Sequence, residues 1–319
     1  MLKIGNLKLN SHLILAPMSG ISDLAFRLLN RKYGAELAFV EMLNVRSLGY
    51  NSRKTEEMLS TNKEDRPLGV QILGCEPEFI LRALDILKNY QYDILDFNAA
   101  CPVKKVTRRG EGASLLKNPA KLQNLLKLVV KNSEVPVTAK IRTGWDKNSI
   151  NAKEIALYAQ DAGISALFIH GRTKFQGYSG KVDYQIIKEV KKALDIPVIA
   201  SGDILSAELA RKMSDETGCD GLLIARGALG NPWFFRQVLK PPGSDEIADT
   251  MLEHLHSCID FYGVRNGVTV FHKFFGWYTR GFRKIRRLRE RAYRTRTKEE
   301  MSAVIADFRG YERVRARDK

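Results

Sequence analysis

Short hydrophobic runs alternate with longer segments of mixed character over most of the first 240 residues. Eight of these runs have the length of buried strands, and several of them are near-continuous in Val, Ile, Leu and Phe. The segments between them place apolar residues at the spacing of amphipathic helices, as over residues 78–89, 120–132, 152–162 and 207–215. The predicted strands span residues 12–18, 37–42, 68–73, 94–98, 136–142, 166–170, 197–201 and 221–225.

This alternation predicts the fold class. A strand, a helix and a second strand in sequence give parallel pairing, and eight such units are the number that closes into a (β/α)8 TIM barrel. Pro77, Pro119 and Pro232 stand where the first turn of a helix tolerates proline. An open, doubly wound sheet remains the alternative, because spacing alone does not establish closure. We predict an α/β fold of the TIM-barrel type.

The pattern changes after residue 240. Pro241, Pro242 and Gly243 form a stretch that ends a helix and suits a linker. Beyond it the hydrophobic spacing is helical, and no run has the character of a strand. We therefore predict two domains, a TIM-barrel domain over residues 1–240 and a small all-helical domain over residues 241–319.

The charge of the chain is concentrated near its C-terminal end. The 319 residues include 52 Lys and Arg against 36 Asp and Glu, which gives a net charge of +16. Residues 265–319 alone carry 17 basic and 6 acidic side chains. Clustered cations attract polyanions and release counterions from phosphates. We therefore expect the predicted helical domain to bind a nucleic acid.

Cysteine spacing and hydropathy limit the class of protein. The four cysteines lie far apart and form no C-x-x-C pair, which is typical of a reducing compartment and argues against a zinc site. No apolar N-terminal run precedes a cleavage site, and no stretch approaches the roughly 20 apolar residues of a membrane span. We expect a monomeric cytoplasmic protein that binds neither a membrane nor a metal.

Polar side chains and glycines stand at most of the predicted strand ends, where the active site of a TIM barrel forms. Gly202 and Gly227 follow the last two strands and would let backbone N–H groups approach a phosphate, although a turn alone would also explain them. No dinucleotide fingerprint or P-loop is present. We interpret this pattern as a mononucleotide site, in which Lys140 beside a flavin would stabilise the reduced ring. His170 ends the next predicted strand.

Cys101 differs from the other three cysteines in its position. It lies between Asn98 and Pro102 at a predicted strand end, just before the basic loop of residues 104–109. We predict that nearby cations lower the pKa of its thiol and prepare it to donate a proton or to act as a nucleophile. The other cysteines are interpreted as small buried hydrophobic residues.

Several motifs occur in a fixed order along the chain. They are Ala16-Pro17-Met18, Gln71-Ile-Leu-Gly74, Asn98-Ala-Ala-Cys101-Pro102, Lys140-Ile-Arg142-Thr-Gly-Trp145, His170-Gly-Arg172-Thr173 and Arg226-Gly-Ala-Leu-Gly-Asn-Pro-Trp233. With these motifs the chain resembles the tRNA-dihydrouridine synthases, and within them the bacterial B-type branch. Two positions depart from the common family pattern, because Ala100 replaces a glycine and Ser201 replaces an asparagine; neither change removes a group that the reaction needs.

The resemblance implies a redox enzyme that acts on a CH–CH bond. FMN, reduced by NADPH or NADH, would deliver hydride to C6 of a tRNA uracil, and Cys101 would protonate C5 to give 5,6-dihydrouridine. The uracil must first swing out of the folded RNA into the pocket. The residues implied for cofactor binding are Ala16, Pro17, Met18, Gln71, Lys140, His170, Ser201, Gly202, Asp203, Ala225, Arg226 and Gly227.

A second set of residues is expected to bind the RNA. Some lie near the predicted pocket and others in the basic C-terminal stretch, where arginines alternate with aromatic residues. We interpret most of those aromatic residues as the core of the helical domain. The expected RNA-binding residues are Asn98, Arg142, Arg172, Tyr178, Lys104, Lys105, Lys273, Arg280, Arg283, Arg286 and Arg287.

Two other functions are compatible with parts of the sequence. A flavin-dependent reductase of a free pyrimidine would use the same barrel, but it would have no need of the basic C-terminal stretch. A non-catalytic RNA-binding protein would use that stretch, but it would have no need of Cys101, Lys140 and His170 together. The combination of both features favours an enzyme that acts on RNA.

Overall fold

The computed structural model describes residues 1–49, 53–236 and 242–313. Parallel strands form a closed ring in which β3 pairs with β4, β4 with β6, and each later strand with the next until β11 returns to β3. The short β5 (Leu43–Asn44) pairs beside β6. The strands of the ring are β3 (Leu13–Leu15), β4 (Leu37–Phe39), β6 (Leu68–Leu73), β7 (Ile94–Asn98), β8 (Val137–Arg142), β9 (Ala166–His170), β10 (Val198–Ser201) and β11 (Gly221–Ile224).

The predicted TIM barrel is confirmed, and the open sheet is excluded by the closed pairing. Strand β3 ends earlier than predicted. Ala16 still donates its N–H to Ile224 at 2.9 Å, but Pro17 has no N–H with which to continue the ladder. The predicted domain boundary at residues 240 and 241 falls within residues 237–241, outside the described part of the chain. The two-domain division therefore stays a prediction.

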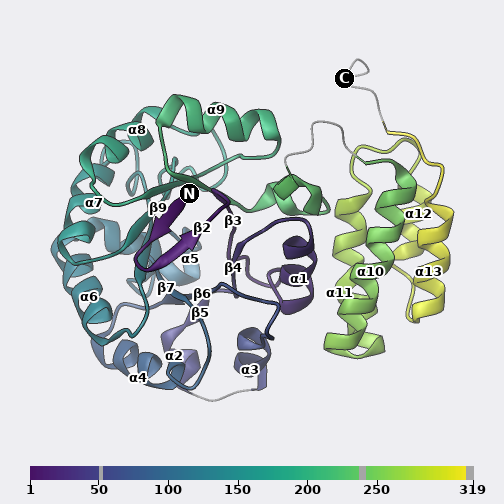
Figure 1. The fold of residues 1–319 in the computed structure, drawn as a ribbon, viewed down its shortest axis with the longest axis horizontal. Coiled ribbons are helices and arrows are strands. Elements are labelled where there is room, and N and C mark those ends of the chain that lie inside the picture. The colour runs from purple at the N-terminus through teal and green to yellow at the C-terminus, as the bar shows by residue number, and fades with distance from the viewer. Residues whose placement is uncertain (50–52, 237–241, 314–319) are drawn as a thin grey trace.

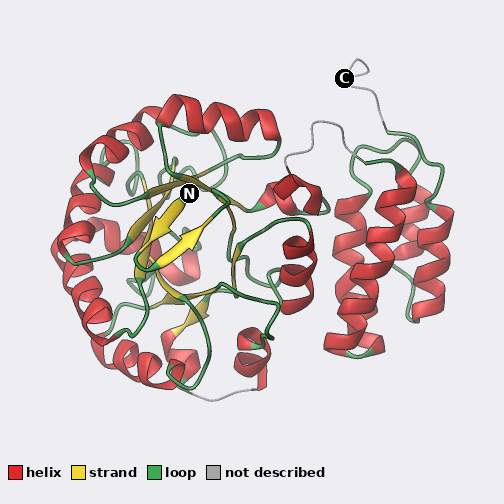
Figure 2. Cartoon of the chain, viewed as in Figure 1, coloured by secondary structure: helices red, strands yellow, loops and turns green. Residues whose placement is uncertain are grey.

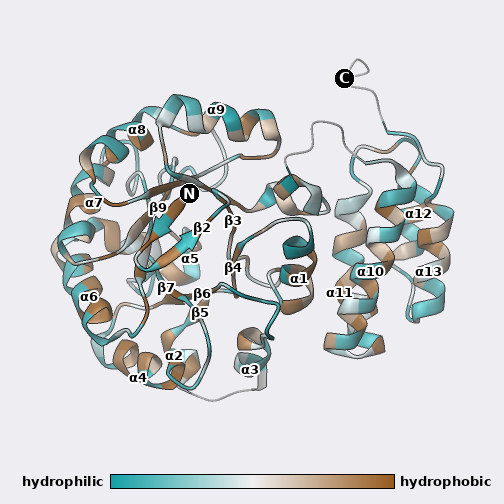
Figure 3. Cartoon of the chain, in the orientation of Figure 1, coloured by the Kyte–Doolittle hydropathy of each residue, from teal (hydrophilic) through white to brown (hydrophobic). Residues whose placement is uncertain are grey.

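Helices surround the barrel, as Figures 1 and 2 show. Several begin at a side chain that accepts a backbone N–H, as Asp23, Asn118, Asp183 and Ser206 do. Their hydrophilic and hydrophobic residues alternate along each helix (Figure 3), as expected for helices that cover a sheet. The helices are α1 (Leu24–Lys32), α2 (Val45–Leu48), α3 (Arg53–Leu59), α4 (Pro77–Leu87), α5 (Lys104–Thr107), α6 (Pro119–Asn132), α7 (Ala152–Asp161), α8 (Tyr184–Ala193) and α9 (Ala207–Thr217).

A hairpin that was not predicted closes the amino end of the barrel. Its strands β1 (Leu2–Ile4) and β2 (Leu7–Leu9) pair in antiparallel fashion around a turn in which Gly5 has φ +59°. Leu2, Ile4 and Leu9 are buried in one cluster with residues from the inside of the barrel. The hairpin thereby blocks this end (Figure 1) and leaves the carboxyl ends of the strands to form the site.

The C-terminal part is helical, as predicted. It consists of α10 (Ser244–Tyr262), α11 (Val264–Tyr278), α12 (Arg286–Ala292) and α13 (Lys298–Asp307). The side chains of Phe271, Phe274 and Phe275 in α11 are fully buried. They supply the core of the helical part, in agreement with the interpretation of the sequence.

Helix α1 joins the barrel to the helical part. Phe26 of α1 stacks on Phe274 with ring centres 5.6 Å apart, and the hydroxyls of Tyr33 and Thr250 lie 2.8 Å apart. At the start of α1, the Tyr262 hydroxyl donates to the buried Asp23 carboxylate at 2.9 Å. Barrel and helical part consequently share one continuous core. Within the described residues, none of the helices has the length and hydropathy of a membrane span.

Candidate active site

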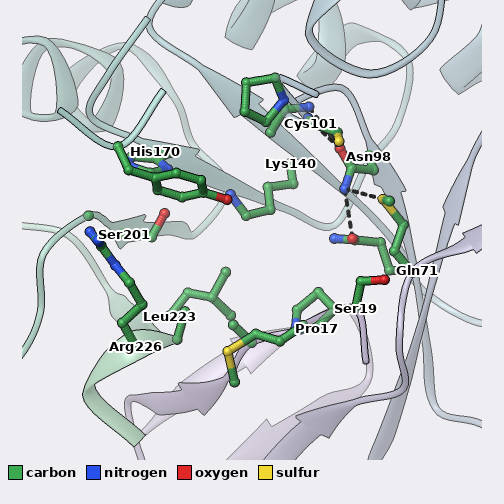
Figure 4. A pocket seen from close by; sticks show the side chains of 18 of the residues that line it. Pro17, Ser19, Gln71, Asn98, Cys101, Lys140, His170, Ser201, Leu223 and Arg226 are labelled. Carbon is green, nitrogen blue, oxygen red and sulfur yellow. Dashed lines mark hydrogen bonds between the residues drawn. The ribbon is translucent and has the colours of Figure 1, made fainter. Parts of the chain in front are cut away.

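A cavity of about 610 Å³ opens at the carboxyl ends of the barrel strands. Apolar Pro17 and Leu223 lie on one side, while Lys140 and His170 approach from other strands (Figure 4). Met18 adds a further apolar side chain to the lining. A flat aromatic ring system with polar edges suits such a cavity. The predicted residues that line it are Ala16, Pro17, Met18, Gln71, Asn98, Cys101, Lys140, Arg142, His170, Tyr178, Ser201, Gly202, Asp203, Ala225 and Arg226.

A chain of hydrogen bonds crosses three strands beneath the cavity. Thr138 and Gln71 both donate to the Asp96 carboxylate at 2.7 Å, and the Asn98 amide donates to the Gln71 carbonyl oxygen, also at 2.7 Å. Burial raises the pKa of Asp96, while the two hydrogen bonds and Lys140 oppose that rise. These hydrogen bonds fix the orientation of the Gln71 and Asn98 amides. Asp96 was not among the predicted site residues, although a carboxylate inside an otherwise apolar strand signals such a role.

Asn98 also shapes the loop that carries Cys101. Its Oδ1 accepts the backbone N–H groups of Ala100 and Cys101, both at 2.9 Å. Its amide contacts Met42 Sδ at 3.1 Å in addition to Gln71. The structure thus gives Asn98 a positioning role, and its predicted contact with the uracil stays a prediction. Ala100 does not have a positive φ, so the common glycine is not needed here.

Cys101 lies at the edge of the cavity and is only partly buried. The cations act on its pKa in the predicted direction, but the predicted net lowering is wrong. Burial raises the pKa of the thiol, and the Val103 N–H, Arg142 and Lys140 offset this effect only in part. The sulfur therefore carries its proton at neutral pH. This state suits a proton donor better than a nucleophile.

Lys140 and His170 come from neighbouring strands. Burial and then the charge of Arg142 lower the pKa of Lys140 to about 8, so it remains mainly cationic at neutral pH. Burial and then the charge of Lys140 lower the pKa of His170 to about 2, which keeps this imidazole neutral. Nε2 of His170 is buried and has no hydrogen-bond partner within the described ranges. An acceptor or donor on a bound molecule would satisfy it.

Arg142 connects the Cys101 loop to the loop after β9. Its Nε donates to the Ala100 carbonyl at 2.7 Å, and its Nη1 donates to the carbonyls of Thr173 and Gly177 at 2.9 Å. Its guanidinium carbon lies 5.8 Å from the ring centre of Tyr178, which is 63% exposed. Burial lowers the pKa of Arg142 to about 10, which still leaves it charged at neutral pH.

The loops after β10 and β11 form a narrow cradle with room for backbone only. Gly202 has φ +128°, and a Cβ there would lie 2.9 Å from Val182. A Cβ on Gly227 would lie 2.3 Å from the Ile204 carbonyl oxygen. Arg226 is half-exposed beside them and ion-pairs with Asp203. Backbone N–H groups with a nearby arginine suit a phosphate.

Several predicted residues lie outside the cavity lining. Arg172 is 1% exposed and donates to the carbonyls of Ser179 and Gly180 and to Asp203, so it holds the loop after β9. Its direct contact with RNA stays a prediction. Ser201, by contrast, does line the cavity, and its hydroxyl donates to the Ile169 carbonyl at 3.1 Å. The other predicted residues not in the lining are Gly227, Lys104, Lys105, Lys273, Arg280, Arg283, Arg286 and Arg287.

Some lining residues were missed by the sequence analysis. Met42 follows β4 and contacts Asn98, and Leu223 forms part of the apolar side of the cavity. Met42 ends a predicted strand, so the rule that sites form at strand ends would have included it. Leu223 lies within a strand, where an apolar residue gives no signal that distinguishes cavity lining from core.

Comparison with known proteins decides the family. A family model described as dihydrouridine synthase matches residues 14–309. The chain belongs to the dihydrouridine synthase family. The resemblance predicted from the motifs is thereby confirmed.

Similarity to relatives in this family extends over most of the chain. The tRNA-dihydrouridine synthase B of Pasteurella multocida is 41% identical over 88% of this chain and 87% of its own. That of Pseudomonas aeruginosa is 39% identical over 96% of this chain and 95% of its own. Histamine dehydrogenase from Rhizobium sp. 4-9 is similar in structure, with a TM-score of 0.57 at 13% identity over 86% of this chain and 50% of that one. This last likeness concerns the fold alone.

Proposed function

We propose that this protein reduces the C5=C6 bond of specific uridines in tRNA to 5,6-dihydrouridine. It is then an oxidoreductase of CH–CH bonds, with FMN as cofactor and NADPH or NADH as reductant. The observation that carries the proposal is the Cys101 thiol on a loop held by hydrogen bonds with Asn98 and Arg142, in the lining of a cavity that also contains Lys140 and His170. The names and extent of the relatives support the same activity.

The residues present fit a flavin mononucleotide. Pro17, Met18 and Leu223 offer an apolar surface to a flat ring, and the orphaned Nε2 of His170 offers a hydrogen bond. The cradle around Gly202 and Gly227 would hold the phosphate with Arg226. The remaining residues predicted for cofactor binding are Ala16, Gln71, Lys140, Ser201, Asp203 and Ala225.

When bound and reduced, FMN supplies the hydride that C6 of the uracil receives. Residues of the protein supply the proton, the positioning and the nearby positive charge. The Cys101 thiol gives its proton to C5, which balances the addition of a hydride to the double bond. Asn98 and Arg142 hold the loop of Cys101 in place through Oδ1 and Nε, so the thiol needs little rearrangement to reach C5. Lys140 provides a positive charge near the site of reduction.

The helical part would bind the tRNA. In our proposal residues 1–240 are catalytic and residues 241–319 form the tRNA-binding domain. Four arginines are exposed on this part, so contact with a polyanion would cost them little desolvation. They are Arg280, Arg283, Arg286 and Arg287. Lys273 donates to the Gly20 carbonyl on the loop after β3, so the helical part also fixes a loop next to the cavity.

The proposal is tested with the purified protein. Flavin absorbance and release of FMN on denaturation test the cofactor. Incubation with unmodified tRNA and NADPH or NADH should convert specific uridines to products heavier by two hydrogens. Free uracil, uridine and orotate serve as matched substrates. Reduction of a free pyrimidine with no change in the tRNA would overturn the proposal and favour a small-molecule reductase.

A further inference from the structure

An exposed aromatic pair flanked by lysines lies on the loops after β8 and β9. Phe175 is 69% exposed and meets Trp145 edge-on, with ring centres 6.1 Å apart. Lys117 Nζ lies 3.7 Å from the centre of the Trp145 ring. Lys174 Nζ lies 4.3 Å from the Trp145 ring and 4.5 Å from the Phe175 ring. We call these four residues the rim platform.

The rim platform has a defined shape because backbone hydrogen bonds join its two loops. The Phe175 N–H donates to the Trp145 carbonyl at 3.0 Å, and the Lys174 N–H donates to the Gly144 carbonyl at 2.9 Å. Trp145 is partly buried and supports Phe175 from one side. An exposed phenylalanine held in this way is preorganised to receive a flat partner.

The rim platform is continuous with the active-site cavity. Arg142, which lines the cavity, donates to the carbonyls of Thr173 and Gly177, on either side of Phe175 in the chain. Tyr178, three residues after Phe175, lines the cavity itself. An RNA strand with one nucleotide in the cavity would therefore place a neighbouring nucleotide at the rim platform.

The chemistry of the platform matches a nucleotide. Phe175 is the most exposed aromatic side chain in the described part of the structure, and exposure of its ring forfeits burial worth a few kcal/mol in a typical core. Its neighbours Lys117 and Lys174 are cations, which favour a ligand with a phosphate. Flat bases stack on exposed aromatic rings in single-stranded nucleic acids. A surface that combines an exposed aromatic ring with neighbouring lysines suits the base and the phosphate of one nucleotide.

We propose that the rim platform binds the nucleotide that flanks the target uridine in the tRNA chain, with its base on Phe175 and its phosphate between Lys117 and Lys174. This inference rests on the proposed function. A uridine that swings into the cavity leaves its neighbour without a stacking partner, which is a large part of the cost of base flipping. Phe175 replaces that partner and stabilises the flipped state.

The first test compares substitutions of Phe175. Phe175→Ala should weaken tRNA binding on the order of tenfold, because a stacked base is lost. Phe175→Trp should retain the affinity of the parent protein. Tyr158→Ala removes an aromatic residue that is 36% exposed on α7 and serves as the control, with no expected change in affinity. Equal melting temperatures would establish that all variants are folded.

The second test changes the RNA. Replacement of the flanking base by an abasic site should weaken binding to the parent protein about as much as Phe175→Ala does, and should not weaken binding to that variant further. The proposal would be overturned if Phe175→Ala bound tRNA with full affinity. It would also be overturned if the abasic site weakened tRNA binding equally in the parent protein and in Phe175→Ala. Dihydrouridine formation by the parent protein is measured alongside, so failure of the proposed function is seen separately from failure of the platform.

Discussion

The role of Cys101 makes the sharpest prediction for catalysis. Replacement by alanine removes the proposed proton donor but leaves Lys140, His170 and the cradle around Gly202 intact. Positioned general acids contribute roughly 10²–10⁴-fold to rate. We therefore expect Cys101→Ala to reduce tRNA uridine about 100- to 10,000-fold more slowly, which corresponds to about 3–5 kcal/mol in the activation barrier. FMN content and tRNA affinity should stay within about twofold of the parent protein.

The pKa values give this prediction a pH dependence. Because burial raises the pKa of the Cys101 thiol above its ordinary value of 9.0, the thiol keeps its proton throughout the neutral range. Because the pKa of Lys140 is lowered to about 8, its positive charge is present below pH 8 and is lost above it. The rate of the parent protein should thus be flat between pH 6 and 7.5 and decline above about pH 8.

A single-turnover experiment separates this chemistry from binding and release. The protein is reduced without oxygen, mixed with saturating tRNA, and followed by the return of oxidised-flavin absorbance and by mass spectrometry of the RNA. Cys219→Ala removes a thiol from another loop and is the matched control. A Cys101→Ala rate within tenfold of the parent, in a protein with normal FMN content, would refute the acid role.

The remaining predictions concern stability and the cradle. Tyr262→Phe should lower the free energy of unfolding by about 1.5–3 kcal/mol in urea titrations, because buried Asp23 loses a hydrogen bond, whereas Tyr92→Phe should change it little. The buried His254 has its pKa lowered to about 3 by burial; its contribution to stability is complete above pH 6.5 and lost toward pH 3, at about 1.4 kcal/mol per pH unit. His254→Gln should flatten the decline of the free energy of unfolding between pH 6.5 and 3. An unchanged slope would count against this role of His254. Gly202→Ala should lower the free energy of unfolding by about 1–3 kcal/mol and weaken FMN binding in fluorescence titrations, because the φ of Gly202 is +128° and Val182 is close. Normal FMN affinity would argue against a phosphate site in the cradle.

Much of the fold could be predicted because its signals are local. The predicted strands at 68–73, 94–98 and 166–170 coincide with β6, β7 and β9, whose residues are all buried. The N-terminal hairpin was missed, although aliphatic residues alternate with lysine on both sides of Gly5. Three-residue strands are too short for hydrophobic periodicity to distinguish them from a loop.

The site could be predicted in outline, because parallel strands bring their carboxyl ends together whatever the details of the loops. Its electrostatics could not. The direction of the Cys101 pKa shift depends on how far burial outweighs the cations, and no sequence spacing measures burial. Likewise the pairing of Trp145 with Phe175 joins two separate loops. Such contacts between loops leave no periodic signal in the chain.

The central claim is that this protein makes dihydrouridine in tRNA with Cys101 as the proton donor. The most direct test maps dihydrouridine by mass spectrometry in tRNA from a strain that lacks the gene, with the parent gene or the Cys101→Ala variant restored. We predict that specific dihydrouridines disappear on deletion, return with the parent gene and stay absent or strongly reduced with the variant. Unchanged dihydrouridine in the deletion strain, with no second enzyme for the same positions, would contradict the function. Full restoration by the variant would contradict the mechanism.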